Sequence, residues 1–425
     1  MNGWSWSVWI YRVLLPWYVL LAFPAWWVKM IRRGGWGRDL WERFGIYQGD
    51  CEFEPCAAVH VHAVSVGEGI LALKLIRAWR ERDPGVVFVL AVATASAKRM
   101  LETQLPAGVR LIYQPVDFRF AVRRYLDRFE PGQVVLVEGE MWPHLMLGCA
   151  RRGILVSLVN ARMSPRSRRR YAKLAAWVRP VFRHLQRVAV QEQDDAAIWE
   201  HLGVTAGRVV VAGSMKFDPA GAPKGGRREE FGAMTGALKR NRKVVLAAST
   251  HGGEERLLVE AIHEAGAFPL IVPRHAERRH EIVEELAAAG RSVVLRSRFE
   301  SVAGDAVLVV DSTGELRDWI EEADVVVIGK SFLGIGGQNP AEALMAGKVV
   351  VFGPHMENFE PLATALVENG GALRVETGDL ARVIRGVLED PERAAGLVAA
   401  GRGVLARHEG ATGRLLDLLG AGDVK

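Results

Sequence analysis

Short apolar runs rich in valine, isoleucine and leucine recur along the chain after Tyr47, and stretches with the periodicity of amphipathic helices separate them. The runs show little alternation between apolar and polar positions, which is typical of strands that helices cover on both faces. In the first half of the chain they occupy residues 59–66, 86–93, 109–116, 134–137, 154–159, 187–191 and 209–212. This part of the chain therefore predicts an α/β domain with a parallel sheet.

A second series of runs follows residues 221–236, a segment rich in glycine, alanine and charged side chains. These runs occupy residues 243–248, 268–272, 292–295, 306–310, 324–328 and 349–352. The chain therefore predicts two Rossmann-like, doubly wound α/β domains, residues 31–220 and 237–405, with a linker over 221–236 and a C-terminal helix over 406–425. We expect the domains to face a cleft, because ligands of such sheets bind at the carboxyl ends of the strands.

The first 30 residues form a separate apolar segment. Residues 4–28 contain one charged side chain, Arg12, and a helix of this length covers a hydrocarbon core of about 30 Å. They therefore predict a membrane anchor helix over residues 1–30, while Arg12, Pro16 and Pro24 leave open whether it spans the bilayer or lies in the interface. By the positive-inside rule, the basic residues that follow place the rest of the chain in the cytoplasm: Lys29, Arg32, Arg33 and Arg38.

Composition and charge limit the kinds of partner. The 425 residues are 49% hydrophobic and 24% charged with a formal net charge of +6, so we expect a globular protein with an anionic partner, either phospholipid, phosphorylated glycolipid or nucleic acid. The three cysteines form no CxxC pair, which favours a reducing compartment and argues against a zinc site. Because the histidines lack metal-site spacing and no Asp-x-Asp pair ends a strand, the sequence predicts no metal.

Residues 325–359 predict a buried strand, a glycine-rich loop, a short helix that begins at Asn339 and Pro340, and a second buried strand. Glycines let backbone N–H groups approach an anion, and a helix N-terminus favours negative charge, so this loop predicts a phosphate cradle. Glu342, in the first turn of the helix, is placed to accept hydrogen bonds from ribose hydroxyls. An ordinary turn with glycines for packing explains any single loop of this kind at least as well.

The same segment resembles the C-terminal signature of the 3-deoxy-D-manno-octulosonic acid (Kdo) transferases of lipopolysaccharide assembly, although Lys330 stands where that family has glycine. Further stretches agree with the family in order and spacing: HAVSVGE at 62–68, EGEMWP at 138–143, LVNARMSPRS at 158–167, GSMKFD at 213–218, ASTHGGEE at 248–255, VPRHAER at 272–278 and DSTGEL at 311–316.

The resemblance implies a B-type glycosyltransferase that moves Kdo from CMP-Kdo to a hydroxyl of a lipid A precursor (lipid IVA) with inversion and without a cofactor. It places this step of lipopolysaccharide core biosynthesis at the cytoplasmic face of the inner membrane. It also implies that the helical tail, residues 391–419, packs back across the first domain. The expected partners are CMP-Kdo, the lipid A precursor and the membrane, with no nucleic acid.

The resemblance assigns the catalytic base to Glu68, and stabilisation of the transition state to Glu138 and Lys216. In the sequence itself, Glu68 follows a strand and lies in the first turn of a helix, where the dipole keeps a carboxylate ionised; a capping charge is the commoner role there. Glu138 and Glu140 follow another strand, and Lys216 supplies a cation for a sugar carboxylate or a leaving phosphate. A salt bridge between Glu138 and Lys216 is an alternative.

Three loops of the second domain are implied to bind the cytidine monophosphate part of the donor. Arg274 offers a planar guanidinium to phosphate, and the backbone at Pro273 and Gly314 is suited to reading a base edge. The implied donor residues are Pro273, Arg274, Thr313, Gly314, Glu315, Asn339, Pro340, Ala341 and Glu342. Ser249, Thr250 and His251 form a further turn that faces an anion.

A basic cluster lies between Asn160 and Ala175. A phosphorylated lipid suits this cluster, and a solvated helix face explains it about equally well. Its members are Arg162, Arg166, Arg168, Arg169, Arg170 and Lys173. The membrane helix favours the lipid, because it confines the enzyme to the surface where a lipid acceptor resides.

Two other classes of protein stay open at this point. Nucleotide-sugar 2-epimerases share the two-domain architecture, and a non-catalytic, membrane-associated module would bind nucleotide or nucleic acid through its arginines. A dehydrogenase is disfavoured, because no G-x-G-x-x-G follows the first strand.

Overall fold

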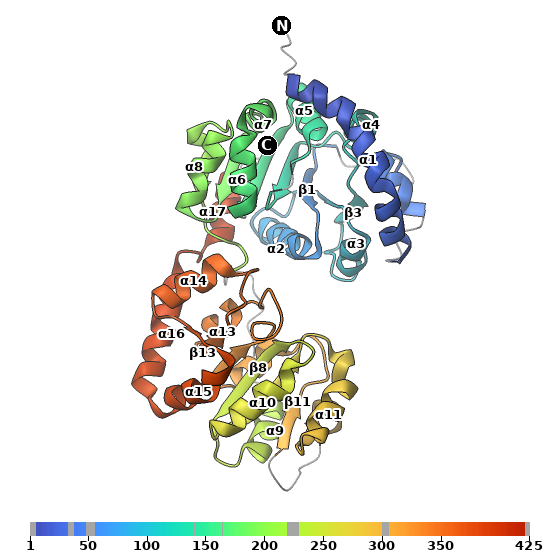
Figure 1. Ribbon diagram of the computed structural model, residues 1–425. Helices are drawn as coiled ribbons and strands as arrows, with labels where there is room; N and C mark the ends of the chain where they lie inside the picture. The colour runs from blue at the N-terminus through green and yellow to red at the C-terminus, as the bar shows by residue number, and fades with distance from the viewer. Residues whose placement is uncertain are drawn as a thin grey trace. The chain divides into compact units, whose positions relative to one another are not determined.

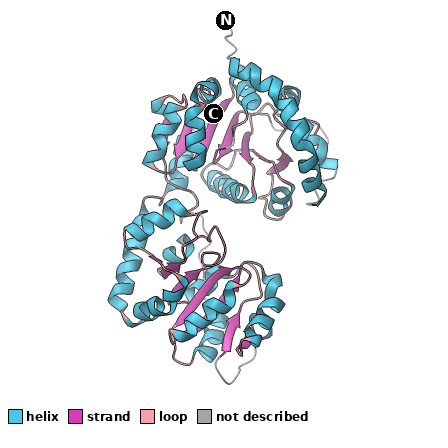
Figure 2. Ribbon diagram, viewed as in Figure 1, coloured by secondary structure: helices cyan, strands magenta, loops and turns pink. Residues whose placement is uncertain are grey.

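In a computed structural model of the chain, the described residues are 6–32, 38–47, 56–139, 141–163, 165–218, 229–299 and 306–420. The chain divides into two compact units (Figure 1). Unit 1 comprises residues 1–221 and 408–425, and unit 2 comprises residues 222–407. Each unit has one sheet with helices on both of its faces (Figure 2), which confirms the prediction of two Rossmann-like α/β domains.

Unit 1 contains a seven-stranded sheet in the order β3-β2-β1-β4-β5-β6-β7, and all of its strand pairs are parallel. Its strands are β1 (Val59–Ala63), β2 (Phe88–Val92), β3 (Arg110–Tyr113), β4 (Gln133–Val137), β5 (Leu155–Ala161), β6 (Arg187–Val190) and β7 (Val209–Val211). The strand order reverses between β1 and β4, so the loops that follow these two strands flank the switch point where such sheets bind ligands.

The helices of unit 1 cover both faces of this sheet. They are α2 (Val66–Arg82), α3 (Ala95–Glu102), α4 (Arg119–Phe129), α5 (Pro143–Arg152), α6 (Pro165–Lys173), α7 (Ala175–Phe182), α8 (Gln193–His201) and α17 (Ala411–Leu419), with short 3-10 helices at η1 (Arg38–Phe44) and η3 (Ala206–Arg208). In β4, Val134 and Leu136 join the core on one face, and Val135 and Val137 join the core on the other. Because both faces are buried, the strands are apolar without alternation.

Unit 2 contains a second seven-stranded parallel sheet in the order β10-β11-β9-β8-β12-β13-β14, which reverses between β8 and β12. Its strands are β8 (Val244–Thr250), β9 (Phe268–Pro273), β10 (Ser292–Leu295), β11 (Ala306–Val309), β12 (Val325–Ile328), β13 (Val349–Phe352) and β14 (Leu373–Arg374). Its helices are α9 (Glu229–Lys239), α10 (Glu254–Glu264), α11 (Arg279–Ala288), α12 (Leu316–Glu321), α13 (Ala341–Met345), α14 (Glu360–Glu368), α15 (Leu380–Glu389) and α16 (Pro391–Ala406), with 3-10 turns η4 (Ala276–Arg278), η5 (Arg296–Arg298) and η6 (Thr377–Asp379).

The second half of the predicted linker is helical. Residues 229–236 belong to α9, and the ring of Phe231 stacks on the ring of Trp319 with centroids 3.9 Å apart. The prediction of a linker over this part was wrong. The segment is rich in glycine and charge, but it also carries an apolar helix face that packs on α12 and on the sheet.

The N-terminal helix α1 (Trp6–Arg32) packs on unit 1 through Val8, which is buried in the core, and through Tyr11, whose hydroxyl donates to Asp117 Oδ2 at 2.8 Å. Its outer face exposes large side chains: Trp6, Trp9, Val13, Leu14, Trp17, Tyr18, Leu20 and Leu21. Among the described residues, no helix is both long enough and apolar enough to cross a bilayer. The spanning form of the predicted helix is therefore not found among the described residues.

Candidate active site

Glu68 lies in the loop region after β1, in the first turn of α2, and exchanges capping hydrogen bonds with Val64 and Ser65 just before this helix. Its Oε2 accepts a hydrogen bond from the N–H of Val64 at 2.7 Å, and its Oε1 accepts one from the hydroxyl of Ser65 at 2.8 Å. The Ser65 hydroxyl in turn accepts the N–H of Glu68 at 3.3 Å. These contacts hold the half-buried carboxylate in one orientation. The capping role weighed for this residue is therefore present, and the lone pairs that remain leave it able to accept a proton.

Glu138 follows β4 on the other side of the switch point, with a left-handed backbone at φ 68°. Its N–H donates to the carbonyl of Val159 at 2.9 Å, and its carbonyl accepts the N–H of Arg162 at 3.1 Å, so the loop is tied to β5. Burial raises the pKa of Glu138; the positive charges of Arg162 and Lys216 oppose this rise and the negative charge of Glu68 adds to it. Glu140, the second carboxylate of this stretch, lies outside the described residues.

Lys216 lies in a turn that follows β7, between Ser214 and Phe217. Burial lowers the pKa of Lys216 to about 8, while the carboxylate of Glu138 raises it and the guanidinium of Arg162 lowers it further. The charge of Glu138 thus interacts both with that of Glu68 and with that of Lys216, although Glu68 and Lys216 are 148 positions apart in sequence (216 − 68).

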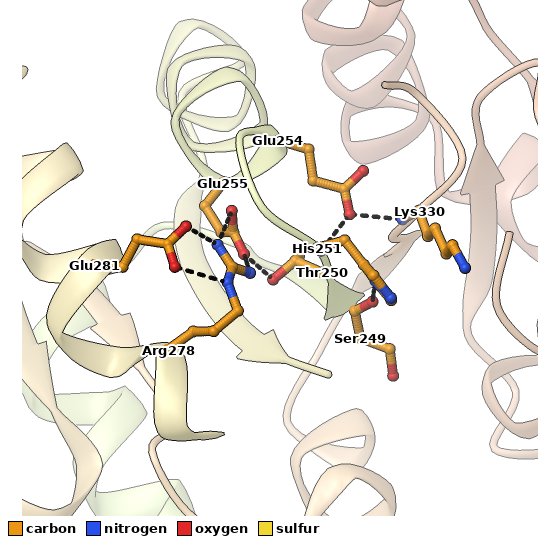
Figure 3. A network of polar contacts seen from close by, with 8 residues as sticks. All are labelled: Ser249, Thr250, His251, Glu254, Glu255, Arg278, Glu281 and Lys330. Carbon is orange, nitrogen blue, oxygen red and sulfur yellow. Dashed lines mark hydrogen bonds and ion pairs between the residues drawn. The ribbon is translucent and has the colours of Figure 1, made fainter. Parts of the chain in front are cut away.

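In unit 2, the corresponding switch point lies between the loops after β8 and β12. Glu255, which is fully buried, accepts hydrogen bonds from Arg278 Nη1 at 2.6 Å and from the Thr250 hydroxyl at 2.9 Å, and Arg278 also binds Glu281 (Figure 3). This network fixes the turn after β8 against η4. Arg278 and Thr250, which belong to stretches that resemble Kdo transferase sequences, therefore hold protein groups together in this structure.

Glu254 joins the two loops at this switch point. Its Oε1 accepts the N–H of His251 at 2.7 Å and the N–H of Lys330 at 2.6 Å, and the Lys330 side chain points away from it (Figure 3). Its Oε2 has no hydrogen-bond partner among the described residues, and burial raises the pKa of Glu254. Lys330 has φ 57°, a left-handed conformation that glycine adopts without strain, which explains the glycine of the family pattern at this position.

The predicted donor residues lie on three loops at the carboxyl edge of the unit 2 sheet. Pro273 ends β9, and the N–H of Arg274 donates to the carbonyl of Thr250 at 3.0 Å while its side chain is exposed. Thr313 and Gly314 are exposed after β11. The carboxylate of Glu315 accepts two hydrogen bonds from Arg296, each of 3.1 Å, so this side chain holds its loop to η5.

Two glycines of the loop from β12 to α13 donate their N–H groups to other parts of the protein. The N–H of Gly336 donates to Glu357 Oε2 at 2.7 Å, and the N–H of Gly337 donates to the carbonyl of Lys330 at 2.9 Å. A Cβ at either glycine would overlap with Asn358 or Met356. These two N–H groups are thus engaged within the protein, and the packing explanation is correct for both glycines.

The short helix α13 starts at the end of the same loop. The side chain of Asn339 accepts the N–H of Ala341 at 3.1 Å, and Pro340 and Ala341 are buried. Glu342 Oε1 lies 3.3 Å from Arg317 Nη2, so its carboxylate is paired and only partly available to a ribose hydroxyl.

Comparison with known proteins identifies the family. The model of the 3-deoxy-D-manno-octulosonic-acid transferase (kdotransferase) family matches residues 38–219. A 3-deoxy-D-manno-octulosonic acid transferase of Bordetella pertussis is 35% identical over 93% of this chain and 96% of its own length. Another, from Haemophilus influenzae, is 31% identical over 89% of this chain and 90% of its own length. The chain belongs to the Kdo transferase family.

Solved structures agree on the fold of this Kdo transferase. A glycosyltransferase from Rickettsia africae has a TM-score of 0.53 at 13% identity and covers 87% of this chain and 100% of its own. A UDP-GlcNAc 2-epimerase from Neisseria meningitidis has a TM-score of 0.56 at 14% identity, over 85% of this chain and 99% of its own. The epimerase shares the fold alone, so family membership, not architecture, decides that the chain is a glycosyltransferase that transfers Kdo in lipopolysaccharide biosynthesis.

The sequence did not single out Asn160 as part of this Kdo transferase's site. Asn160 is fully buried; its Nδ2 donates to Glu138 Oε1 at 3.4 Å, and its Oδ1 accepts the N–H of Met215 at 3.0 Å. It therefore links the Glu138 loop to the Lys216 loop. The signal was its place in LVNARMSPRS, directly after an apolar run, where a strand ends at the switch-point edge.

Proposed function

We propose that this Kdo transferase moves Kdo from CMP-Kdo to a hydroxyl group of a lipid A precursor (lipid IVA), with inversion at the anomeric carbon. The observation that carries the proposal is the grouping of Glu68, Glu138 and Lys216 around the switch point of unit 1. The acceptor hydroxyl must lose a proton and the leaving phosphate must gain negative charge, so the reaction needs a base and a cation.

Glu68 is the base of this proposal. Its carboxylate takes the proton from the acceptor hydroxyl while that oxygen forms a bond to the anomeric carbon of Kdo. The bond between this carbon and the phosphate oxygen breaks in the same step, and CMP leaves. A single displacement inverts the configuration. The N–H of Val64 and the hydroxyl of Ser65 hold Glu68 so that its orientation is fixed before the acceptor arrives.

Lys216 and Glu138 stabilise the transition state in this proposal. The ammonium group of Lys216 is the cation that faces the Kdo carboxylate or the leaving phosphate. Because the pKa of Lys216 is lowered to about 8, the group is mainly protonated at neutral pH and loses its charge above that value. Glu138 keeps the ammonium charged, since its negative charge raises the pKa of Lys216.

Unit 2 is the donor domain of the proposal. Its loops at 273–274, 313–315 and 339–342 bind the CMP part of CMP-Kdo, with the exposed guanidinium of Arg274 on the phosphate. Unit 1 is the acceptor domain of the proposal. The proposed transfer uses neither a cofactor nor a metal ion.

The acceptor's phosphates bind the basic face of α6 in this proposal. Arg168 is already paired with Asp195 at 2.6 Å, whereas Arg166, Arg169 and Arg170 are exposed. The cytoplasmic face of the inner membrane is the proposed location, with α1 lying in the interface and its exposed tryptophan and leucine side chains in the lipid.

The product tests the reaction. The full chain is incubated with CMP-Kdo and a tetraacylated lipid A precursor, and the lipid is analysed by mass spectrometry while released CMP is measured. We expect the lipid to gain the mass of one or more Kdo residues, with one CMP released for each. CMP release without a heavier lipid would show hydrolysis of the donor instead of transfer. The absence of both CMP release and a heavier lipid would refute the proposal.

Vesicle binding tests the location. Replacing Leu14 and Leu21 together with aspartate is expected to reduce co-sedimentation with anionic vesicles by at least about fivefold, because the variant puts charge on the side of α1 that this proposal places in the lipid. Val211→Asp, at an exposed position of β7, is the control. Equal sedimentation of all three proteins would exclude α1 as the membrane contact.

A further inference from the structure

The turn that carries Lys216 is held by side chains from three distant parts of unit 1. The carbonyl of Met215 accepts a hydrogen bond from Lys74 Nζ at 2.9 Å, and the N–H of Met215 donates to Asn160 at 3.0 Å. The N–H of Ser214 donates to Nδ1 of His408 at 3.2 Å. The orientation of each peptide group before Lys216 is therefore set by a different element, and His408 sets the first one.

His408 occupies a distinctive place in the chain. The residue before it, Arg407, ends unit 2, and His408 is the first residue of the tail that returns to unit 1. Its side chain is 2% exposed and its ring lies 5.3 Å, centroid to centroid, from the ring of Phe217 in the same turn. The return of the chain from unit 2 thus ends directly on the Lys216 turn.

The hydrogen bond assigns the tautomer of His408. A backbone N–H only donates, so Nδ1 must carry the lone pair that accepts from Ser214. The proton then resides on Nε2, which lies 3.7 Å from Oε1 of Glu192. The carboxylate favours this arrangement, because an N–H oriented toward a negative charge is stabilised.

The tail that begins at His408 and the turn that carries Lys216 are joined by further hydrogen bonds. The carboxylate of Asp218, two residues after Lys216, accepts the N–H of Gly410 at 3.1 Å and the N–H of Thr412 at 2.7 Å. Asp218 thereby caps the first turn of α17, whose leucines pack in the unit 1 core. The residues on both sides of Lys216 are therefore bound to the returning tail.

We infer that His408 is a positioning residue for Lys216: its Nδ1 fixes the Ser214 peptide and so places the lysine ammonium next to Glu138. The inference rests on the role of Lys216 under the proposed function. Without an acceptor at the Nδ1 position, the Ser214 N–H is left unpaired in a buried place and the turn rearranges to reach another partner. The ammonium then moves away from the position where negative charge develops.

Three substitutions at one position test this role. Asparagine at residue 408 puts an amide oxygen close to the place of Nδ1, whereas glutamine fills more of the ring's volume but puts its terminal group close to the place of Nε2. His408→Ala and His408→Gln are expected to lower kcat by about 10- to 100-fold, the usual cost of misplacing a catalytic group by about 1 Å. His408→Asn is expected to restore kcat to within about threefold of the wild type. The KM for CMP-Kdo is expected to stay within about twofold in all three.

The order of the variants separates positioning from packing. If His408 serves only to fill space, glutamine replaces it better than asparagine, and this order overturns the inference. The pH profile is a second readout: in His408→Ala, the alkaline limb of kcat is expected to move away from about pH 8, because the displaced ammonium changes both its burial, which lowers the pKa of Lys216, and its contact with Glu138, which raises that pKa. An unmoved limb would also overturn the inference.

Two further variants serve as controls. Asp417→Ala breaks an exposed ion pair between α17 and Arg82, so it loosens the same tail without touching the turn, and kcat is expected to stay unchanged. Lys216→Met tests the proposed function itself. Loss of transfer in Lys216→Met together with wild-type kcat in His408→Ala and His408→Gln refutes the inference alone, whereas full activity of Lys216→Met refutes the role of Lys216 and the inference with it.

Discussion

Glu68 in unit 1 and Glu254 in unit 2 occupy matching places, yet their surroundings differ. Each lies in the first turn of the helix that follows the first strand of its sheet, beside the switch point of that sheet. Glu68 is half-buried and accepts hydrogen bonds from Val64 and Ser65, within its own loop. Glu254 is 1% exposed and accepts the N–H of Lys330, which is 76 positions away in sequence.

The difference teaches how one topology yields two kinds of carboxylate. A glutamate held by its own loop can stay partly exposed, as Glu68 does. A glutamate that joins two loops is enclosed by them and holds the shape of the edge instead. We therefore expect chemistry from Glu68 and architecture from Glu254.

The largest effect is expected when the carboxylate of Glu68 in unit 1 is removed. Glu68→Gln keeps hydrogen-bonding atoms but removes the base, so kcat is expected to fall at least about 1,000-fold. CMP affinity, measured by calorimetry, is expected to stay unchanged, because the donor binds unit 2. Ser65→Ala is the control: it removes the cap at a cost of about 1 kcal/mol of stability and is expected to leave kcat within about tenfold. Turnover retained by Glu68→Gln would remove Glu68 as the base.

The pH dependence of the transfer rate tests the charge of Lys216 in the same site as Glu68. The wild-type transfer rate is expected to fall above pH 8, because the lowered pKa of Lys216, about 8, means that its ammonium loses the proton there. In Lys216→Arg the guanidinium stays charged, so the alkaline limb is expected to disappear while kcat falls by about 10- to 100-fold through altered geometry. The exposed Lys243→Arg is the control and should keep the limb. A limb that persists in Lys216→Arg belongs to another group.

A smaller effect is expected on the side of unit 2. Glu254→Ala leaves the N–H groups of His251 and Lys330 without their acceptor, which is expected to lower the free energy of unfolding by about 2 kcal/mol. Glu254→Gln keeps an acceptor oxygen and is expected to stay within about 1 kcal/mol of the wild type. Chemical denaturation measures both. A loss of kcat in Glu254→Gln, with stability unchanged, would assign chemistry to this carboxylate and end the contrast with Glu68.

The smallest effect concerns the exposed Arg274, which the proposal places on the donor phosphate. Arg274→Ala is expected to weaken CMP binding about tenfold, because one charge-assisted hydrogen bond to phosphate is lost. Calorimetry with CMP measures this, with Arg382→Ala, an exposed arginine paired with Asp379, as the control. Equal affinity of wild type and Arg274→Ala would refute the assigned role of Arg274.

Much of the fold could be predicted, because buried parallel strands are long apolar runs and the helices between them are amphipathic. The exceptions share a cause. Gly336 and Gly337 have the composition of an anion-binding loop, but the partners of their N–H groups are Glu357 and Lys330, which only the folded chain brings near. The linker prediction failed over α9 because the ring of Phe231 stacks on that of Trp319, which is 88 positions away in sequence (319 − 231).

The loops that carry Glu68, Glu138 and Lys216 could be placed from the sequence, because each follows an apolar run that forms a strand. The roles of these three residues came from the resemblance to the family. The residues that hold them were not predictable in the same way. Asn160 and His408 are buried, and each acts by accepting a hydrogen bond from a backbone N–H group of the Lys216 turn.

The sequence by itself determined the two parallel sheets, the loops that carry charge and the family, since these depend on local patterns and on stretches read in order. Tertiary structure alone decided which charges share one edge, which glycines serve packing, and that the returning tail meets the Lys216 turn. The physical reason is that hydrogen bonds and burial depend on distance in space, and a strand order that reverses at β1 and β4 brings together residues that are far apart along the chain.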